Sequence, residues 1–344
     1  MELEQTINKS DLSKDDLIYL LDLKDSNEIL RLYEKADEIR KQYCGDEVHL
    51  RGIIEISNHC DEDCLYCCIR IGNKELERYR MLPEEIIDTA KIISNIGIRT
   101  VVLQSGLDTA FSADKIAYII YSIKQEAEIA VALSLGERNY EEYKTWKYAG
   151  AEKYYLKHET INATLNSIYH KPCDVRERTE HIESLKSLGF RVGVGTLIGL
   201  PYQTTENIAE DLLFFKQLDV DLASFSTFIP FGDTLFSEDT AGSFELTLKT
   251  IAAGRILLKN INIPATTSIA SLDPKGREQA LKVGANVILP NFTPNNYSAK
   301  YNSYRKRQNL LNSPINDKGE IQELLISLGR KISWTESNSP SKKQ

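Results

Sequence analysis

The sequence predicts an α/β fold, a complete (β/α)8 TIM-type barrel with an N-terminal helical extension. Short apolar or β-branched runs recur eight times in the chain, and each is followed by a longer amphipathic stretch. This alternation is what a parallel barrel requires. With 344 residues and 42% hydrophobic content, the chain is also long enough to bury a single barrel core.

The elements follow in order along the chain. Residues 10–43 carry leucines at helical spacing, with Ser10 and Ser13 as candidate N-caps, so a helical segment precedes the barrel. Further helices are expected to start at Pro83 and Thr205, where acidic residues fall in the first turn. The eight strands are expected at residues 53–57, 100–104, 129–134, 153–157, 191–198, 222–228, 263–268 and 286–290.

These elements divide the chain into three parts. We expect residues 1–46 to form the helical extension, 47–312 the barrel, and 313–344 a C-terminal helix and a disordered polar tail.

The composition of the chain restricts the classes of partner that we expect it to bind. A formal charge of -8, from 42 basic and 50 acidic residues, argues against a nucleic-acid-binding surface. The start of the sequence lacks a signal segment, and no apolar run approaches the roughly 20 residues of a membrane span. Four of the six cysteines lie between positions 60 and 68, which favours reduced ligands in the cytoplasm over disulfides. We expect small molecules or proteins as partners, and neither nucleic acid nor membrane.

The most specific motif is the cysteine run that follows the first expected strand. Cys60, Cys64 and Cys67 can hold three corners of one 4Fe-4S cluster and leave the fourth iron open. Structural zinc and inert thiols are the alternatives, but zinc sites usually take a second ligand pair from a distant segment, and none is visible. Cys68 would be a fourth thiolate, although adjacent side chains on an extended segment diverge.

This run, with Tyr66 before its last cysteine, resembles the signature of the radical S-adenosylmethionine superfamily. The resemblance implies an enzyme in which the open iron binds S-adenosylmethionine and an electron from the cluster yields a 5'-deoxyadenosyl radical.

Polar residues also follow the other expected strands, where a parallel barrel collects its functional groups. Together with their neighbours, these segments resemble the iron-only hydrogenase maturase HydE family over residues 10–332, more than the related biotin synthase and methylornithine synthase. The segments are 54–58 (IEISN), 78–81 (RYRM), 102–106 (VLQSG), 133–137 (LSLGE), 158–160 (HET), 198–201 (IGLP), 228–230 (FIP), 263–267 (IPATT), 284–288 (GANVI) and 290–294 (PNFTP).

The family resemblance implies roles for individual residues. Cys60, Cys64 and Cys67 would ligate the cluster, and an arginine would pair with the carboxylate of the cofactor in a bidentate manner. The implied contacts to S-adenosylmethionine come from Tyr66, Gln104, Ser134, Glu159 and Arg178. The implied substrate-side residues are Thr266, Thr267, Tyr301 and Tyr304, joined by Lys153 and Lys157.

Some positions depart from the family. Cys68 replaces a glycine, and Lys153 and Lys157 replace arginines, so the planar five-donor guanidinium is lost there. The leading hypothesis is a HydE-type enzyme acting on a small sulfur- or iron-bearing precursor in hydrogenase active-site assembly. The alternatives are a paralogue acting on an amino acid or organic thioether, and a non-catalytic cluster scaffold or carrier. The resemblance also implies a reducing donor such as ferredoxin or flavodoxin, and other hydrogenase maturases as partners.

Overall fold

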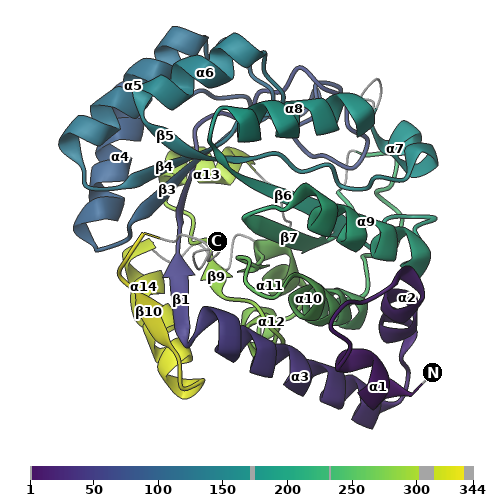
Figure 1. Ribbon diagram of the computed structural model, residues 1–344. Helices are drawn as coiled ribbons and strands as arrows, with labels where there is room; N and C mark the ends of the chain where they lie inside the picture. The colour runs from purple at the N-terminus through teal and green to yellow at the C-terminus, as the bar shows by residue number, and fades with distance from the viewer. Residues whose placement is uncertain (1, 171–174, 232–233, 302–313, 337–344) are drawn as a thin grey trace.

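The computed structural model describes residues 2–170, 175–231, 234–301 and 314–336 (Figure 1). Its strands are β1 (Glu47–Leu50), β2 (Gly52–Glu55), β3 (Thr100–Gln104), β4 (Ala130–Ser134), β5 (Ala151–Tyr155), β6 (Arg191–Ile198), β7 (Leu222–Thr227), β8 (Pro264–Ala265), β9 (Val287–Ile288) and β10 (Lys331–Ser333). Its helices are α1 (Leu3–Ile7), α2 (Lys14–Asp22), α3 (Ser26–Cys44), α4 (Pro83–Asn95), α5 (Ala113–Glu126), α6 (Tyr140–Ala149), α7 (Ala163–Tyr169), α8 (Val175–Ser187), α9 (Thr205–Leu218), α10 (Phe244–Leu258), α11 (Thr267–Leu272), α12 (Gly276–Lys282), α13 (Asn295–Tyr301) and α14 (Pro314–Ser327).

The strands form two sheets in which every pair is parallel. The larger sheet has the order β2-β3-β4-β5-β6-β7, and the smaller has the order β10-β1-β9-β8. Consecutive strands of the larger sheet are neighbours, and helices lie in the connections between them, so this sheet is a parallel half-barrel. Isolated parallel bridges join Ile53 to Asn291 and Leu222 to Asn262, at the two edges where the sheets meet.

The strand predictions are largely confirmed. The strands at 100–104 and 191–198 have the expected bounds, whereas the last two expected strands are reduced to the short β8 and β9. Two strands of the smaller sheet, β1 and β10, were not predicted. Strand β5 begins and ends two residues earlier than expected, which moves Lys157 past the end of the strand.

The helices begin where local chemistry favours a start. Pro83 opens α4 with Glu84 and Glu85 in its first turn, as expected. Ser13 forms a capping box with Asp16 at the start of α2, whereas Ser10 caps no helix. The expected helical region at 10–43 is therefore two helices, α2 and α3.

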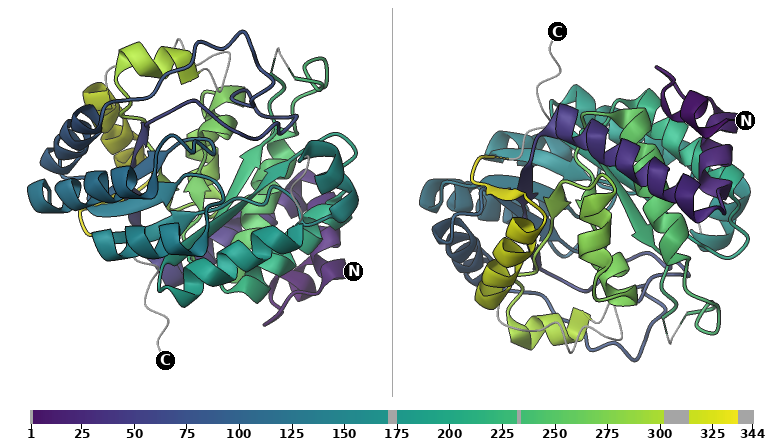
Figure 2. Two further views of the ribbon diagram at one scale, coloured as in Figure 1. Left: turned by 90° about the horizontal axis from the view of Figure 1, so that it is seen from above. Right: turned by 90° about the horizontal axis from the view of Figure 1, so that it is seen from below.

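The helices surround the strands, and the N-terminal helices lie at one side of the molecule (Figures 1 and 2). Helix α3 packs against α10, and α2 packs against α9 and α10. The core includes the fully buried strand side chains Val101, Leu103, Val131 and Leu133. The part of the tail at 337–344 lies outside the described residues.

The loops after β2–β7 leave the larger sheet at one end, where their polar side chains can meet. Within the described ranges, none of the helices combines the length and the apolar character that crossing a bilayer would demand.

Candidate active site

The cysteine run lies in the long loop between β2 and α4, and backbone hydrogen bonds fix it to neighbouring loops. The Asp61 amide donates to the Leu107 carbonyl at 2.8 Å, and the Leu65 amide donates to the Tyr169 carbonyl at 2.9 Å. Within the run, the Cys67 amide donates to the Cys64 carbonyl at 2.9 Å, so a tight turn brings these two cysteines together.

Gly106, after β3, lies directly against this loop. A Cβ atom at position 106 would lie 2.6 Å from the Cys60 Cβ, 2.6 Å from the His59 carbonyl oxygen and 2.9 Å from the Cys60 Sγ. These distances are well inside the roughly 3.5–4.0 Å at which carbon atoms normally pack. The close approach of Cys60 to the third strand therefore depends on the missing side chain at position 106.

The three cysteines influence one another electrostatically. Burial raises the pKa of Cys60 to about 11, and the Cys67 thiol adds to this shift. Burial, with contributions from Cys67 and Cys60, raises the pKa of Cys64 well above its usual range. A hydrogen bond with Cys68 is the largest cause that raises the pKa of Cys67, and burial is the second. A metal that bound these thiols would have to displace their protons.

A cavity of about 300 Å³ lies beside the cysteines at the carboxyl ends of the strands. Cys60 and Cys67 line it, whereas Cys64 is not among its lining residues. The cavity collects side chains that the sequence singled out on six different segments of the chain, two of them at the ends of β3 and β4. They are Tyr66, Gln104, Ser134, Glu159, Arg178 and Tyr301.

Glu159 combines an unusual backbone conformation with an unsatisfied carboxylate. Its φ is 63°, a left-handed value that costs free energy in a residue with a Cβ. Hydrogen bonds from Thr196 Oγ1 at 2.7 Å and the Leu197 amide at 3.1 Å hold its carbonyl. In the described residues its buried Oε2 has no hydrogen-bond partner, and burial raises the pKa of the carboxyl. Such a group is suited to accept hydrogen bonds from a ligand.

Arg178 reaches the cavity from α8. Its Nε donates to Glu137 Oε1 at 2.7 Å, and its Nη1 donates to the Lys157 carbonyl. The Arg178 side chain is 14% exposed, so its position is set by surrounding contacts. Glu137 lies after β4, in the segment 133–137. It orients the guanidinium toward the cavity, which suits the recognition of a second carboxylate.

His170 is a site residue that sequence reasoning missed. It follows α7, and its ring lies between Tyr66 and Cys64, with Nε2 3.0 Å from the tyrosine Oη and Nδ1 3.3 Å from Sγ. Burial lowers the pKa of His170 to about 3. A lone histidine after a short helix gives no local signal, because 104 residues separate it from Tyr66.

A second cavity, of about 140 Å³, extends from the first into the interior of the strands. The two share Gln104, Ser134, Tyr155, Lys157 and Ser226, and the second adds Glu55, Thr266 and Thr267. Gln104 Nε2 donates to Tyr301 Oη at 3.3 Å, which joins the two sides of the mouth. Tyr304 lies outside the described residues.

Lys153 does not lie in either cavity. It alternates with Tyr155 and Lys157 along one face, and four residues of strand span about 13 Å. Its Nζ donates to Glu336 Oε1 at 2.9 Å at the opposite end of the strands, and it lines a cavity of only about 10 Å³. The two lysines therefore lie apart, although both are expected at the substrate side: Lys157 lines both cavities beyond the end of β5, and Lys153 pairs with Glu336.

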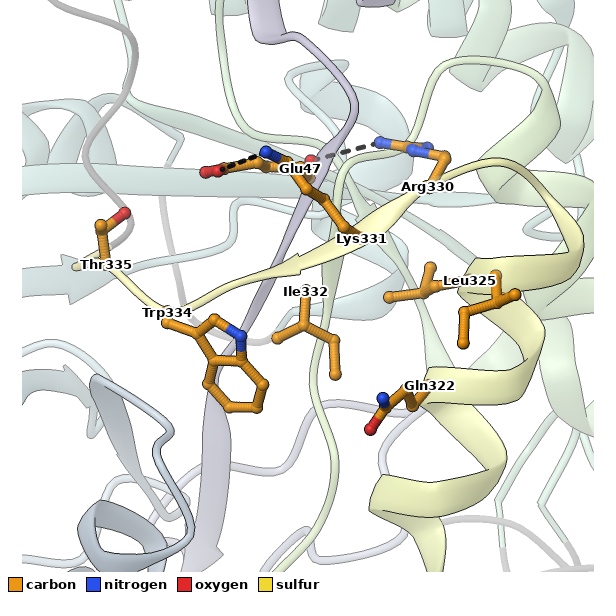
Figure 3. Close-up of a pocket in the computed structure, with 9 residues that line it drawn as sticks. Glu47, Gln322, Leu325, Arg330, Lys331, Ile332, Trp334 and Thr335 are labelled. Atoms are coloured by element: carbon orange, nitrogen blue, oxygen red, sulfur yellow. Dashed lines mark hydrogen bonds and ion pairs between the residues drawn. The ribbon is translucent and has the colours of Figure 1, made fainter.

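A larger cavity, of about 430 Å³, lies between α14 and β10 (Figure 3). Leu325, Ile332 and Trp334 line it together with Glu47 and Arg330. None of its lining residues is a cysteine or follows a strand of the larger sheet. Arg330 Nη1 donates to the carbonyl groups of Leu281, in α12, and Ala285, so this cavity lacks converging groups for catalysis.

Comparisons with known proteins bear on the chemistry of this site. Residues 54–215 match the family model of the radical SAM superfamily. The chain is 44% identical to the [FeFe] hydrogenase maturase subunit HydE of Thermotoga maritima, over 88% of this chain and 87% of that protein. It is 28% identical to the 3-methylornithine synthase of Methanosarcina acetivorans, over 83% and 81%. The crystal structure of methylornithine synthase (PylB) has a TM-score of 0.85, at 24% identity and 96% and 97% coverage, and supports the fold.

Proposed function

The chain belongs to the HydE family of radical SAM enzymes, and we propose that it acts on a small sulfur- or iron-bearing precursor in [FeFe] hydrogenase maturation. The observation that carries the proposal is one continuous pair of cavities. The cysteines lie at one end, and a small polar chamber inside the strands lies at the other.

The residues fit the cofactors of the family, a 4Fe-4S cluster and S-adenosylmethionine. The three thiols influence one another, and Gly106 leaves room for Cys60. No three His, Cys, Asp or Glu side chains in the described ranges are arranged to hold a single metal ion. A cluster makes no such demand, because its ligands bind different irons. When bound, the cluster and S-adenosylmethionine supply an electron and a 5'-deoxyadenosyl radical.

We assign Cys60, Cys64 and Cys67 as the cluster ligands. Cys68 is excluded from this set, because a fourth thiolate would occupy the iron that the cofactor needs. Its Sγ lies 3.8 Å from the Tyr301 carbonyl oxygen, as a weak donor would.

The cofactor contacts in this proposal come from five side chains around the first cavity. Glu159 has an acceptor available, and Arg178 is a cation oriented by Glu137. These two suit, respectively, the donor groups and the carboxylate of S-adenosylmethionine. The other three contacts are Tyr66, Gln104 and Ser134.

The substrate chamber is small and lined with hydroxyl groups. Thr266, Thr267 and Lys157 face it, and Tyr301 lies at its junction with the cofactor cavity. Buried Glu55 lines the chamber as well, and an ammonium and a carboxylate among hydroxyl groups favour a small polar ligand. Lys153 is not part of this proposal.

We further propose that the two sheets close into the complete (β/α)8 barrel over residues 47–312. The bridges Ile53–Asn291 and Leu222–Asn262 support closure, because they connect the larger sheet to the smaller one at both edges. The extension at 1–46 and the helix and tail at 313–344 would then flank a single barrel.

The proposal includes a cytoplasmic location, since the reduced cluster is incompatible with an oxidising compartment. It also includes a low-potential electron donor, such as ferredoxin or flavodoxin, and the other hydrogenase maturases as functional partners.

The test uses protein reconstituted anaerobically with iron and sulfide. We expect dithionite and S-adenosylmethionine to give 5'-deoxyadenosine, and the protein to restore hydrogenase activity in a maturation mixture that lacks HydE. The control, Cys64→Ala, should do neither. Cleavage without restored hydrogenase would favour the paralogue, and a cluster without cleavage would favour the carrier.

A further inference from the structure

The end of α7 is attached to the cysteine loop at three points. The Leu65 amide donates to the Tyr169 carbonyl at 2.9 Å. On the next residue, His170 Nδ1 lies 3.3 Å from Cys64 Sγ and Nε2 lies 3.0 Å from Tyr66 Oη. The Tyr66 and His170 rings meet edge to face, with centroids 5.2 Å apart and planes at 73°. The imidazole is thus held from both sides, and it is only 4% exposed.

The chemistry of the two partners determines where the imidazole carries its proton. A cluster-bound Cys64 is a thiolate and can only accept, so Nδ1 must be the protonated nitrogen. In a neutral ring Nε2 is then an acceptor, and the Tyr66 hydroxyl is a donor at the right distance. A single tautomer satisfies both contacts, in the order Tyr66 O–H to Nε2, then Nδ1–H to Sγ.

We propose that His170 is a positioning residue that donates a hydrogen bond to the Cys64 thiolate, raises the reduction potential of the cluster and fixes the Tyr66 ring. The proposal rests on the assignment of Cys64 as a cluster ligand.

Hydrogen bonds to cysteine sulfur raise cluster potentials, because they stabilise the extra negative charge of the reduced state. The Tyr66 hydroxyl increases this effect by polarising the imidazole through Nε2. The same ring holds the tyrosine that borders the cofactor cavity. The His170 side chain therefore connects the cluster to the cofactor pocket. It acts on the cluster through Cys64 and on the pocket through Tyr66.

The two nitrogens of His170 can be tested separately. Asparagine places an amide nitrogen near the position of Nδ1, and glutamine places one near the position of Nε2. The variants are His170→Leu, which removes both contacts, His170→Asn, which retains a donor toward Cys64, and His170→Gln, which does not. His181→Asn is the matched control, because its Nδ1 contacts the Tyr143 hydroxyl at 3.2 Å, outside the cofactor site.

The measurement is the midpoint potential of the cluster in the reconstituted enzyme without S-adenosylmethionine, followed by electron paramagnetic resonance. We expect a lower potential in His170→Leu and His170→Gln, and a potential close to the original in His170→Asn and His181→Asn. An unchanged potential in His170→Leu, or equal shifts in the Asn and Gln variants, would overturn the proposal. If His170→Leu binds no cluster, the comparison of Asn with Gln decides.

Tyr66→Phe is the second probe, and it is also followed by the midpoint potential of the cluster. Tyr66→Phe keeps the ring but removes the donor to Nε2, so the potential should fall by less than in His170→Leu. An effect as large as that of His170→Leu would contradict the order of the hydrogen bonds. If the unsubstituted protein cleaves S-adenosylmethionine but all the variants have its midpoint potential, only the proposed role of His170 is refuted. If it binds no cluster, the proposed function itself fails.

Discussion

Replacing Gly106 by alanine should displace the first cluster ligand. The new Cβ would lie 2.6 Å from the Cys60 Cβ and 2.6 Å from the His59 carbonyl oxygen. Normal carbon contacts are about 3.5–4.0 Å, so the loop would have to move by about 1 Å. Backbone and Cβ atoms cannot rotate away, so the movement falls on the ligand loop itself.

The cost follows from overpacking in a closely packed region. Extra atoms of this kind destabilise by about 1–3 kcal/mol, which corresponds to roughly 5- to 140-fold in an equilibrium constant. We expect Gly106→Ala to have a lower free energy of unfolding and, after reconstitution, less iron and sulfide per chain.

The matched control is Gly319→Ala in α14. No atom lies within 4 Å of the Cβ that this change adds. A glycine in a helix interior is about 0.5–1 kcal/mol less favourable than alanine, so the control should be slightly more stable and bind a full cluster. Iron and sulfide analysis and denaturant unfolding are the assays. A full cluster and an unaltered unfolding midpoint in Gly106→Ala would refute the close approach of Cys60 to the third strand.

Three further outcomes are expected. Cys68→Ala should keep the cluster and cofactor cleavage, whereas Cys64→Ala should lose both; equal loss would give Cys68 a ligating role. Arg178→Ala should weaken S-adenosylmethionine binding by about 1.5–3 kcal/mol, or roughly 12- to 140-fold, with the cluster spectrum unchanged. Calorimetry with the reconstituted protein measures this, and unchanged affinity would remove Arg178 from the site. Glu336→Gln should lower the free energy of unfolding by about 1–2 kcal/mol, between the values for exposed and buried ion pairs, because Lys153 is 1% exposed and Glu336 39%. Burial lowers the pKa of Lys153 to about 8, so the deficit should be present at neutral pH and shrink above pH 8, where the lysine loses its charge. If the difference in the free energy of unfolding stays constant up to pH 9, it does not come from the Lys153–Glu336 ion pair.

The sequence by itself predicted the repeating strand and helix pattern, because apolar periodicity and helix-start signals are local properties. Strands β3 and β6 have the predicted bounds, and α4 begins at the predicted proline. The spacing of Cys60, Cys64 and Cys67 is equally local. Together with the segments after the strands, it was sufficient for the family, which the identity to HydE confirms.

Pairing between distant segments could not be predicted from the sequence. Strands β1 and β10 are short and lie far apart in the chain, and they become strands by pairing with each other. The expected strand at 263–268 shrinks to β8 because Thr266, the next residue, is the N-cap of α11. The expected strand at 286–290 shrinks to β9.

Only the tertiary structure decided which predicted residues share a site. Lys157 lies at the cavity beyond the end of β5, whereas Lys153, within the strand, pairs with Glu336. His170 carries no motif, and its contacts with Cys64 and Tyr66 exist because the end of α7 folds back onto the cysteine loop. Local patterns specify elements and ligand spacing. The direction of a side chain and the partner it meets depend on register and long-range packing, which no short window of sequence contains.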